Sequence, residues 1–313
     1  MQVLIAEDDP VSRRILQSVL ARWDFQPIAV EDGAEAWQVM QQPNPPRLVI
    51  LDWNMPQIDG LEVCRLLRAQ EGTEYSYIIL LSARGARQDM IDGMGAGADD
   101  YITKPFDPDE LKLRLRAARR ILQLQADLLH AQESLRQQAT HDDLTGLWNR
   151  RAILDVLDRE LARAGREQRS LAVMLVDVDH FKNVNDTYGH HTGDIVLRQL
   201  ADRMGAMLRP YDLVGRYGGE EFMAILPGCE FTFTRDVAER LRKTVADQPM
   251  VIGDIDIELT VSLGVAAKNT PTQGDADTLI RLADEALYLA KGAGRNCVRT
   301  IDDVGAVTTT DIS

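Results

Sequence analysis

A long segment without glycine or proline divides this chain of 313 residues into two halves. Pro108 suits the first turn of a helix, and neither breaker recurs before Gly146, so the segment predicts one long helix. Apolar side chains recur in it at alternating steps of three and four residues, at Ile121, Leu124, Leu128, Ala131 and Leu135. This heptad seam predicts a helical coiled-coil stalk over residues 107–140 that a second, parallel chain completes. A helix that lies on its own domain is the alternative.

The half before the stalk alternates between two patterns. Short apolar runs such as QVLIA, RLVILDW and YIILLSA predict buried strands, and VSRRILQSVLARW and LEVCRLLRAQ have helical spacing. Strands that alternate with helices form right-handed βαβ units. Residues 1–120 are therefore expected to form a flavodoxin-like α/β domain, which is a doubly wound parallel sheet with helices on both faces.

The half after the stalk predicts a second α/β domain over residues 141–300. LAVMLVDVD and IELTVSLGVAA predict strands, DLVGRYGGEEFMAILP predicts an antiparallel hairpin, and four segments of helical spacing lie among them. Residues 301–313 predict a frayed tail.

Charge and composition exclude several classes of protein. The net charge of −14 argues against nucleic-acid partners and anionic membranes, because phosphate groups need a basic face. No apolar run approaches the length of a bilayer span, and MQVLIAEDD does not fit a signal peptide, so we expect no membrane insertion. The cysteines Cys64, Cys229 and Cys297 are far apart, which predicts free thiols in a reducing cytoplasm.

Polar side chains stand where the strands of the first domain end. Glu7 and Asp8 follow VLIA, and Asp52 follows LVIL. The carboxyl ends of parallel strands form the ligand crevice of such a sheet. Carboxylates gathered there would repel one another unless a hard cation such as Mg²⁺ neutralised them. Ser82 and Lys104 end two further strands, and their hydroxyl and ammonium groups complete a pattern that favours a phosphoryl site.

The motifs AEDD, LDWNMPQIDG, LLSA and DDYITKPF together resemble the receiver domain of bacterial response regulators. The resemblance implies that Asp52 accepts a phosphoryl group from a histidine kinase. It also implies that Glu7 belongs to the acidic pocket and that Asp8, Asp52 and the backbone carbonyl of Asn54 hold Mg²⁺.

The same resemblance implies the switch residues of the receiver. Ser82 and Lys104 would contact the phosphoryl oxygens, and Tyr101 would be the aromatic switch. Asp9 corresponds to the residue after the acidic pocket, so it has no expected role as a ligand.

Carboxylates also stand at a strand end and a hairpin turn of the second domain. Asp177 ends an apolar strand, and Glu220 and Glu221 follow two glycines in RYGGEEF. If the turn lies beside that strand end, these carboxylates can form a Mg²⁺ site. Such a metal takes its remaining oxygens from substrate phosphates, to which the backbone around His180 and Phe181 could offer N–H groups.

Nearby polar residues have the chemistry to recognise guanine. The amide of Asn185 can meet the carbonyl of the base, and the carboxylate of Asp194 can accept from its N–H groups. His190 is expected to brace this substrate loop rather than to bind a metal. Asp142 and Asp143 predict a helix N-cap region, and two glycines in a hairpin are by themselves most often a turn alone.

The motifs DDLTGLWNRR, DVDHFKNVNDTYGHHTGD, RYGGEEF and YLAKGAGRN occur in that order. Together they are similar to the GGDEF domain of diguanylate cyclases, a fold that resembles nucleotidyl cyclases. The resemblance implies an enzyme that joins two GTP into cyclic di-GMP and releases two pyrophosphates. Asp177, the Val178 carbonyl and Glu220 would bind Mg²⁺, or Mn²⁺ in its place, and Glu220 with Glu221 would help to deprotonate the ribose 3′-hydroxyl.

Further roles follow from the same resemblance. Lys182, Lys291 and Arg295 would neutralise the triphosphate as the pyrophosphate leaves. Asn185 and Asp194 would bind guanine, and an aspartate at the second position favours GTP over ATP.

An inhibitory product site is implied just before the hairpin. Arg209 and Asp212 have the RxxD spacing of the site at which the family binds cyclic di-GMP. Arg240 is a candidate secondary contact.

The reaction needs two GGDEF domains that face each other, so the resemblance implies a homodimer or a higher homo-oligomer. We expect phosphorylation of Asp52 to change receiver pairing and the stalk to transmit that change.

One alternative is a catalytically silent GGDEF module that binds nucleotide and signals through contacts. A DNA-binding output would need a basic helix-turn-helix, and a phosphodiesterase a further domain; the sequence offers neither.

Overall fold

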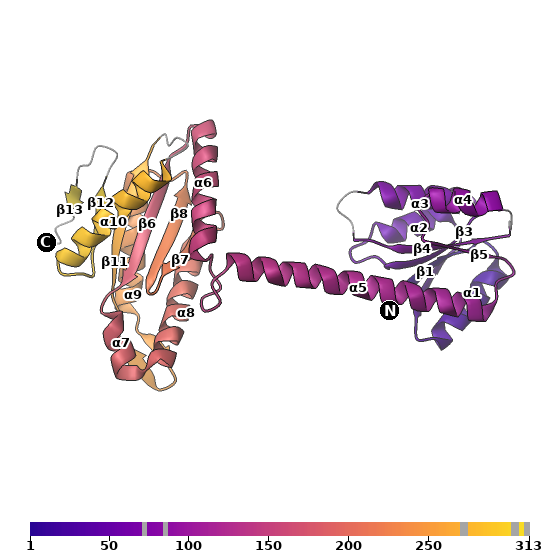
Figure 1. Ribbon diagram of the computed structural model, residues 1–313, viewed down its shortest axis with the longest axis horizontal. Helices are drawn as coiled ribbons and strands as arrows, with labels where there is room; N and C mark the ends of the chain where they lie inside the picture. Colours follow the sequence, from indigo (N-terminus) through magenta and orange to yellow (C-terminus); the bar gives the residue numbers. More distant parts are fainter. Residues whose placement is uncertain (71–73, 84–86, 270–274, 302–306, 310–313) are drawn as a thin grey trace. The chain divides into compact units, whose positions relative to one another are not determined.

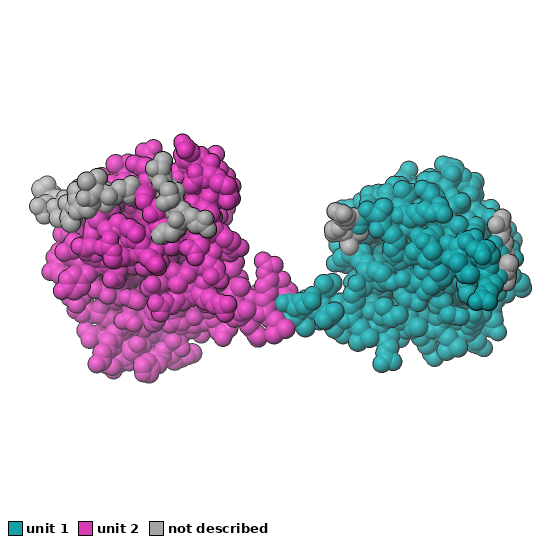
Figure 2. All heavy atoms as spheres, turned by 45° about the horizontal axis from the view of Figure 1, so that its top comes forward, with its two compact units in different colours: residues 1–132 teal, residues 133–313 magenta. Residues whose placement is uncertain are grey.

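The computed structural model describes residues 1–70, 74–83, 87–269, 275–301 and 307–309. The chain forms two compact units, Met1–Gln132 and Glu133–Ser313, which Figure 2 shows in teal and magenta. The division falls inside helix α5 (Pro108–Thr140), so the segment expected to form the stalk belongs to both units. Among the described residues, no helix has the length and apolar content to cross a bilayer.

Unit 1 is a five-stranded parallel sheet with helices on both faces (Figure 1). Its strands are β1 (Gln2–Ala6), β2 (Gln26–Val30), β3 (Leu48–Asp52), β4 (Tyr77–Ser82) and β5 (Asp100–Thr103). Its helices are α1 (Pro10–Arg22), α2 (Gly33–Met40), α3 (Gly60–Ala69), α4 (Arg87–Gly95) and the first part of α5. The strand order β2-β1-β3-β4-β5 is that of doubly wound flavodoxin-like folds, which confirms the predicted fold class.

Each face of this sheet has its own apolar core. Val3 and Ile5 of β1 pack with buried leucines of α1 and α5, whereas Leu4 and Ala6 pack with residues of α2 and α3. Successive side chains of a strand point to opposite faces, so a strand that is buried on both faces must be apolar throughout. This explains the unbroken apolar run VLIA, which follows the exposed Gln2.

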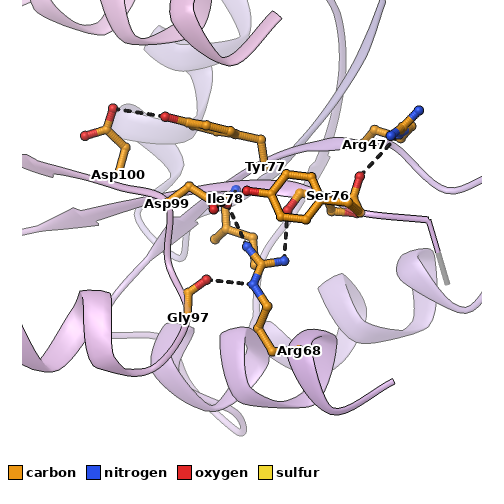
Figure 3. A network of polar contacts seen from close by, with 9 residues as sticks. Arg47, Arg68, Ser76, Tyr77, Ile78, Gly97, Asp99 and Asp100 are labelled. Atoms are coloured by element: carbon orange, nitrogen blue, oxygen red, sulfur yellow. Dashed lines mark hydrogen bonds and ion pairs between the residues drawn. The ribbon is translucent and has the colours of Figure 1, made fainter. Parts of the chain in front are cut away.

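A polar network fastens the amino ends of β4 and β5 (Figure 3). Arg68 of α3 pairs through Nη2 with Oδ2 of Asp99 at 2.6 Å. Its other nitrogens donate to the backbone carbonyls of Ser76 at 2.9 Å and Gly97 at 2.8 Å. The network thus ties α3 to the segments that lead into both strands.

Helix α5 changes its surroundings along its length. Leu111, Leu115, Ala118 and Leu122 are buried in the core of unit 1. Beyond them, Leu124, Leu128 and Leu135 have exposed fractions of 57%, 58% and 65%. The exposed stripe has the predicted heptad spacing, and its pairing with a second chain remains a prediction.

Unit 2 contains a six-stranded mixed sheet of order β13-β12-β11-β6-β8-β7 (Figure 1). Its strands are β6 (Leu171–Val178), β7 (Leu213–Gly218), β8 (Glu221–Pro227), β11 (Val261–Lys268), β12 (Val298–Ile301) and β13 (Val307–Thr309). Strands β9 (Met250–Ile252) and β10 (Ile255–Ile257) form a separate hairpin. The helices are α6 (Arg150–Glu167), α7 (Phe181–Tyr188), α8 (His190–Met207), α9 (Phe231–Asp247) and α10 (Ala276–Gly292).

The structure differs from the sequence prediction at the C-terminal end. Ile301, where the frayed tail was expected to begin, is a buried residue of β12. Val307–Thr309 form β13, which pairs antiparallel with β12. The other tail residues, 302–306 and 310–313, lie outside the described residues.

Helices cover both faces of the second sheet. Alternate residues of β6 pack either with α6 and α10 or with α8 and α9. Helix α10 approaches β11 very closely at Gly264, where an added Cβ would lie 2.1 Å from the carbonyl oxygen of Ala283. This close contact positions the last turn of α10, which carries Lys291, beside the carboxyl end of β6.

Candidate functional site

One charged cluster lies at the carboxyl ends of β1, β3 and β5. Lys104 Nζ is 2.6 Å from Glu7 Oε2 and 2.8 Å from Asp52 Oδ2. Glu7 and Asp52 are buried and Asp8 is exposed, and one carboxylate oxygen from each lies within 4.8 Å of the others. The structure thus brings together three acids and one base that the sequence predicted for the phosphoryl site.

The electrostatics of this cluster favour a cation. Burial raises the pKa of Glu7 to about 7, the charge of Asp52 adds to the effect, and Lys104 opposes it. Burial lowers the pKa of Lys104, but its hydrogen bonds with Asp52 and Glu7 outweigh burial and raise it. One ammonium therefore leaves the carboxylates incompletely neutralised, and an all-oxygen donor set of this kind fits Mg²⁺.

The remaining receiver candidates surround the cluster. Ser82 is buried at the end of β4, and its carbonyl accepts from Lys104 N at 2.7 Å. Tyr101 is only 5% exposed and packs edge-to-face on Trp53, with ring centroids 6.3 Å apart. Trp53 follows Asp52 directly, so the expected switch residue contacts the neighbour of the expected phosphorylation site. Asn54 is exposed in the next loop position.

Asp9 has a structural role instead. Its carboxylate caps α1 by accepting from Ser12 N at 2.7 Å. A carboxylate in this position stabilises the first turn of the helix.

A second acidic cluster lies at the carboxyl end of β6. In the antiparallel pair of β6 and β8, Asp177 lies opposite Glu221. Val178 N donates to the carbonyl of Glu220 at 3.4 Å, which holds the glycine turn against this strand end. Residues far apart in the chain therefore meet where the sequence predicted a metal site.

The glycine turn is held by a brace that the sequence analysis missed. Gly219 has a φ of +44°, a conformation that favours glycine, and its carbonyl accepts from Arg216 Nε at 2.8 Å. Arg216 Nη1 also lies 3.2 Å from both oxygens of Asp142. The prediction of a helix N-cap at Asp142 and Asp143 was wrong, because Asn149 caps α6 by accepting from Ala152 N at 3.0 Å.

Lys291 enters the cluster from α10, with Nζ 2.7 Å from Asp177 Oδ2. Burial raises the pKa of Asp177; Lys291 opposes this shift, while Glu220 adds to it. The pKa of Glu221 is also raised, first by burial and then by the charge of Asp177. As in unit 1, the carboxylates exceed the available positive charge, and carboxylate oxygens are the donors that a divalent hard cation prefers. Among the described residues, only the acids Glu7, Asp8 and Asp52 of unit 1 already stand close enough together for one ion.

Asp179 supports the site without belonging to the predicted set. It is buried and accepts from Thr260 Oγ1 and Ser262 Oγ, both at 2.7 Å, and from Asn296 N at 2.9 Å. These bonds fix the loop that carries Arg295, whose side chain is exposed. Only the DVD spacing beside Asp177 hinted at this role in the sequence.

The predicted nucleotide-binding residues lie on α7 and α8. His180 has a φ of 55° before α7, Phe181 is buried, and Lys182 is exposed.

Asn185 packs on α8 at Gly193, where a Cβ added to the glycine would lie 2.0 Å from Oδ1 of Asn185. The two residues expected to bind guanine are thus close together, since Asp194 follows Gly193. His190 is exposed at the first position of α8.

The RxxD residues close a turn before β7. Arg209 N donates to Asp212 Oδ2 at 2.9 Å, and Asp212 N donates to the carbonyl of Arg209 at 2.9 Å. Burial raises the pKa of Asp212, and its Oδ1 has no hydrogen-bond partner among the described residues. Arg209 lines a groove of about 960 Å³ together with Arg163 of α6, which the sequence analysis did not single out.

Arg240 lies apart from this groove. It is exposed on α9 and lines a different depression with Glu239 and Lys243. Within this unit, the structure does not bring Arg240 together with the groove of Arg209.

Comparisons with known proteins find relatives for both units of the chain. Residues 139–297 match the family model "Diguanylate cyclase, GGDEF domain", and residues 3–116 match the response regulator receiver domain. The response regulator PleD of Caulobacter vibrioides is 34% identical over 304 residues, which cover 95% of this chain and 65% of PleD. The diguanylate cyclase DosC of Escherichia coli K12 is 41% identical over 53% of this chain and 36% of DosC.

A solved structure shows the same fold in unit 2. The coiled coil and GGDEF domain of DgcB from Caulobacter crescentus, solved in complex with c-di-GMP, matches with a TM-score of 0.55 and 34% identity. The match covers 60% of this chain and 98% of that chain. The chain therefore belongs to the GGDEF family of diguanylate cyclase domains, which it joins to a response regulator receiver domain.

Proposed function

We propose that this chain is a diguanylate cyclase that converts two GTP into cyclic di-GMP and two pyrophosphates. The observation that carries the proposal is the meeting of Asp177, Glu221 and Lys291 at one strand end. Asp177 lies opposite Glu221 in the register of β6 and β8, and Lys291 Nζ is 2.7 Å from Asp177. Carboxylates for a metal and a cation for phosphates are the groups that phosphoryl transfer requires.

The residues divide the work of the reaction between them. Mg²⁺ held by Asp177, the Val178 carbonyl and Glu220 would supply positive charge to the triphosphate. Glu221 is the better candidate to accept the proton of the 3′-hydroxyl, because its raised pKa brings a carboxylate closer to the basicity that a general base needs near neutrality.

Cations and polar side chains bind the rest of the substrate. Lys291, Lys182 and Arg295 neutralise the phosphates as charge develops on the leaving pyrophosphate. Asn185 and Asp194 bind guanine through the edge of the base.

The 3′-hydroxyl of each GTP attacks the α-phosphorus of the other GTP, so the bond to pyrophosphate breaks as the new phosphodiester bond forms.

Two GTP molecules must face each other, and this requires two chains. We propose that the exposed leucines of α5 pair in a parallel homodimer or higher homo-oligomer.

We also propose that a histidine kinase phosphorylates Asp52 and that the change reaches the cyclase domains through α5. The buried contact between Tyr101 and Trp53 supports this route, because it joins the neighbour of Asp52 to β5, next to α5.

Product inhibition completes the proposal. The carboxylate of Asp212 has a buried oxygen without a partner among the described residues, and Arg209 lines the adjoining groove. A guanine base offers N–H groups to such a carboxylate and acceptors to the guanidinium. Cyclic di-GMP is therefore the proposed ligand of this groove.

The test uses the full chain in a reducing, cytoplasm-like buffer, after bound nucleotide has been removed. The protein is incubated with GTP and Mg²⁺, with and without beryllofluoride, and cyclic di-GMP is measured. Product that increases with beryllofluoride supports both the cyclase and its phosphorylation control. Product that does not respond overturns the control alone, and no product in either case favours a silent GGDEF module that only binds nucleotide.

A further inference from the structure

The guanidinium of Arg209 lies against two aromatic rings. Its Cζ is 4.2 Å from the ring centroid of Phe233 and 5.7 Å from that of Tyr211. Both distances are within the range of about 6 Å in which a cation is attracted to an aromatic face. Arg209 Nη1 also donates to the hydroxyl of Tyr211 at 3.0 Å.

The two rings come from different elements. Tyr211 lies in the turn before β7, and Phe233 lies in the first turn of α9. The backbone of the turn is fixed by the two hydrogen bonds between Arg209 and Asp212. The arginine is therefore held at its backbone by the turn and at its guanidinium by a helix that follows later in the chain.

Both rings remain open to solvent. The exposed fraction is 55% for Tyr211 and 38% for Phe233. Single exposed aromatic residues are common on protein surfaces, but these two flank the residue that lines the groove of about 960 Å³, and Tyr211 lines that groove as well. An exposed aromatic face beside a guanidinium is a surface on which a purine base can stack.

We propose that Tyr211, Phe233 and Arg209 form an aromatic platform for the inhibitory product. In this platform Phe233 is a positioning residue that holds the guanidinium, and Tyr211 stacks on a guanine base of a cyclic dinucleotide. The inference rests on the proposed binding of cyclic di-GMP at Arg209 and Asp212. An arginine that is already held loses less side-chain freedom on binding, so the platform strengthens product binding beyond what the RxxD residues give alone.

Calorimetric titration of the nucleotide-free full chain with cyclic di-GMP tests the platform. We expect Phe233→Leu and Tyr211→Leu each to weaken binding roughly 3- to 10-fold, because the attraction of a cation or a base to the ring is lost while the apolar volume is largely kept. Phe233→Tyr keeps the ring and should bind within about twofold of the wild type. The product concentration that halves GTP turnover should rise by the same factors.

Control variants separate this inference from the proposed function. Arg209→Ala should abolish binding in the groove; if it binds cyclic di-GMP like the wild type, the proposed inhibitory site is wrong and the platform with it. If Arg209→Ala loses binding but both leucine variants bind like the wild type, the site stands and the platform is overturned. Val251→Ala changes an exposed apolar residue of the same unit outside the groove and should bind normally. The rescue by Phe233→Tyr excludes simple misfolding as the cause of weaker binding.

Discussion

Arg216 links the glycine turn of the cyclase site to the segment that follows α5. Its Nη1 lies 3.2 Å from both carboxylate oxygens of Asp142, two residues after the end of the helix, and its Nε holds the carbonyl of Gly219 at 2.8 Å. Burial alone would raise the pKa of Asp142, but hydrogen bonds from Thr145 and the charge of Arg216 outweigh burial and lower it. Asp142 is thus a charged partner that orients the arginine of the turn.

Replacing Asp142 with alanine should therefore impair the cyclase. Without its partner Arg216 can leave the turn, and a small displacement of Glu220 and Glu221 lowers turnover by about 10- to 100-fold. The initial rate at saturating GTP measures this effect. Asp143→Ala is the matched control, because the neighbouring carboxylate is exposed and its loss should leave the rate unchanged. Equal rates for both variants would contradict the proposed brace.

The pH dependence of turnover should report the raised pKa of Glu221. Burial and the charge of Asp177 raise this pKa above the ordinary glutamate value of 4.5. A general base works only when it is deprotonated, so activity should fall as the pH is lowered through the pKa of Glu221. Glu221→Gln should lower turnover roughly 10²- to 10⁴-fold and remove this limb of the pH–rate profile. An acid limb that persists unchanged in Glu221→Gln would assign the titration to another group.

The contact of Gly264 with α10 predicts a large effect on stability. In Gly264→Ala, the added Cβ would lie 2.1 Å from the carbonyl of Ala283, so α10 must move away from β11. We expect a loss of about 1–3 kcal/mol in the free energy of unfolding, measured with urea, and a lower turnover because Lys291 moves with the helix. Gly205→Ala is the control: it lies in α8 with nothing within 4 Å and should stabilise the protein by about 0.5–1 kcal/mol. A stable, active Gly264→Ala protein would argue against the close packing.

The exposed stripe of α5 predicts a change in assembly. Leu124→Asp and Leu128→Asp place a charge in the proposed seam, so each should shift the protein toward monomers in sedimentation experiments and lower turnover in parallel. His130→Asp adds the same charge on an exposed residue outside the seam and should leave both properties intact. If the oligomer survives even when Leu124 and Leu128 are both replaced with aspartate, another surface must join the chains.

Much of the fold could be predicted because its strands are buried on both faces. Such strands require unbroken apolar runs, and β6 is buried at each of its eight residues. Strand ends followed by acids then indicated both sites, since the position of Asp52 or Asp177 after its strand is local information. The family motifs supplied the roles that the local pattern left open.

Features that depend on distant partners were not predictable in this way. Asp142 and Arg216 are 74 residues apart, and only the folded chain shows that they pair. Asp179 is buried through acceptor contacts with β11 and the segments beside it, which no spacing reveals. Strand β13 is three residues long and pairs at the edge of β12, so it lacks a pattern of its own.

Binding of Mg²⁺ to the receiver unit should strengthen as the pH rises through about 7, because burial raises the pKa of Glu7 to about 7. Below that pH Glu7 is protonated and the pocket has one negative charge fewer.

The same shift in the pKa of Glu7 has a consequence for stability. The folded-state pKa exceeds the ordinary value of 4.5, so without metal the unit loses stability as the pH rises from about 4.5 to about 7. Glu7→Gln should flatten both dependences, whereas Glu74→Gln, which changes an exposed carboxylate on the same unit, should preserve them. The signal for the Mg²⁺ titration is the intrinsic tryptophan fluorescence, to which the buried Trp53 next to Asp52 contributes as one of the four tryptophans of the chain. Metal affinity that is independent of pH in the wild type would contradict the assignment of this titration to Glu7.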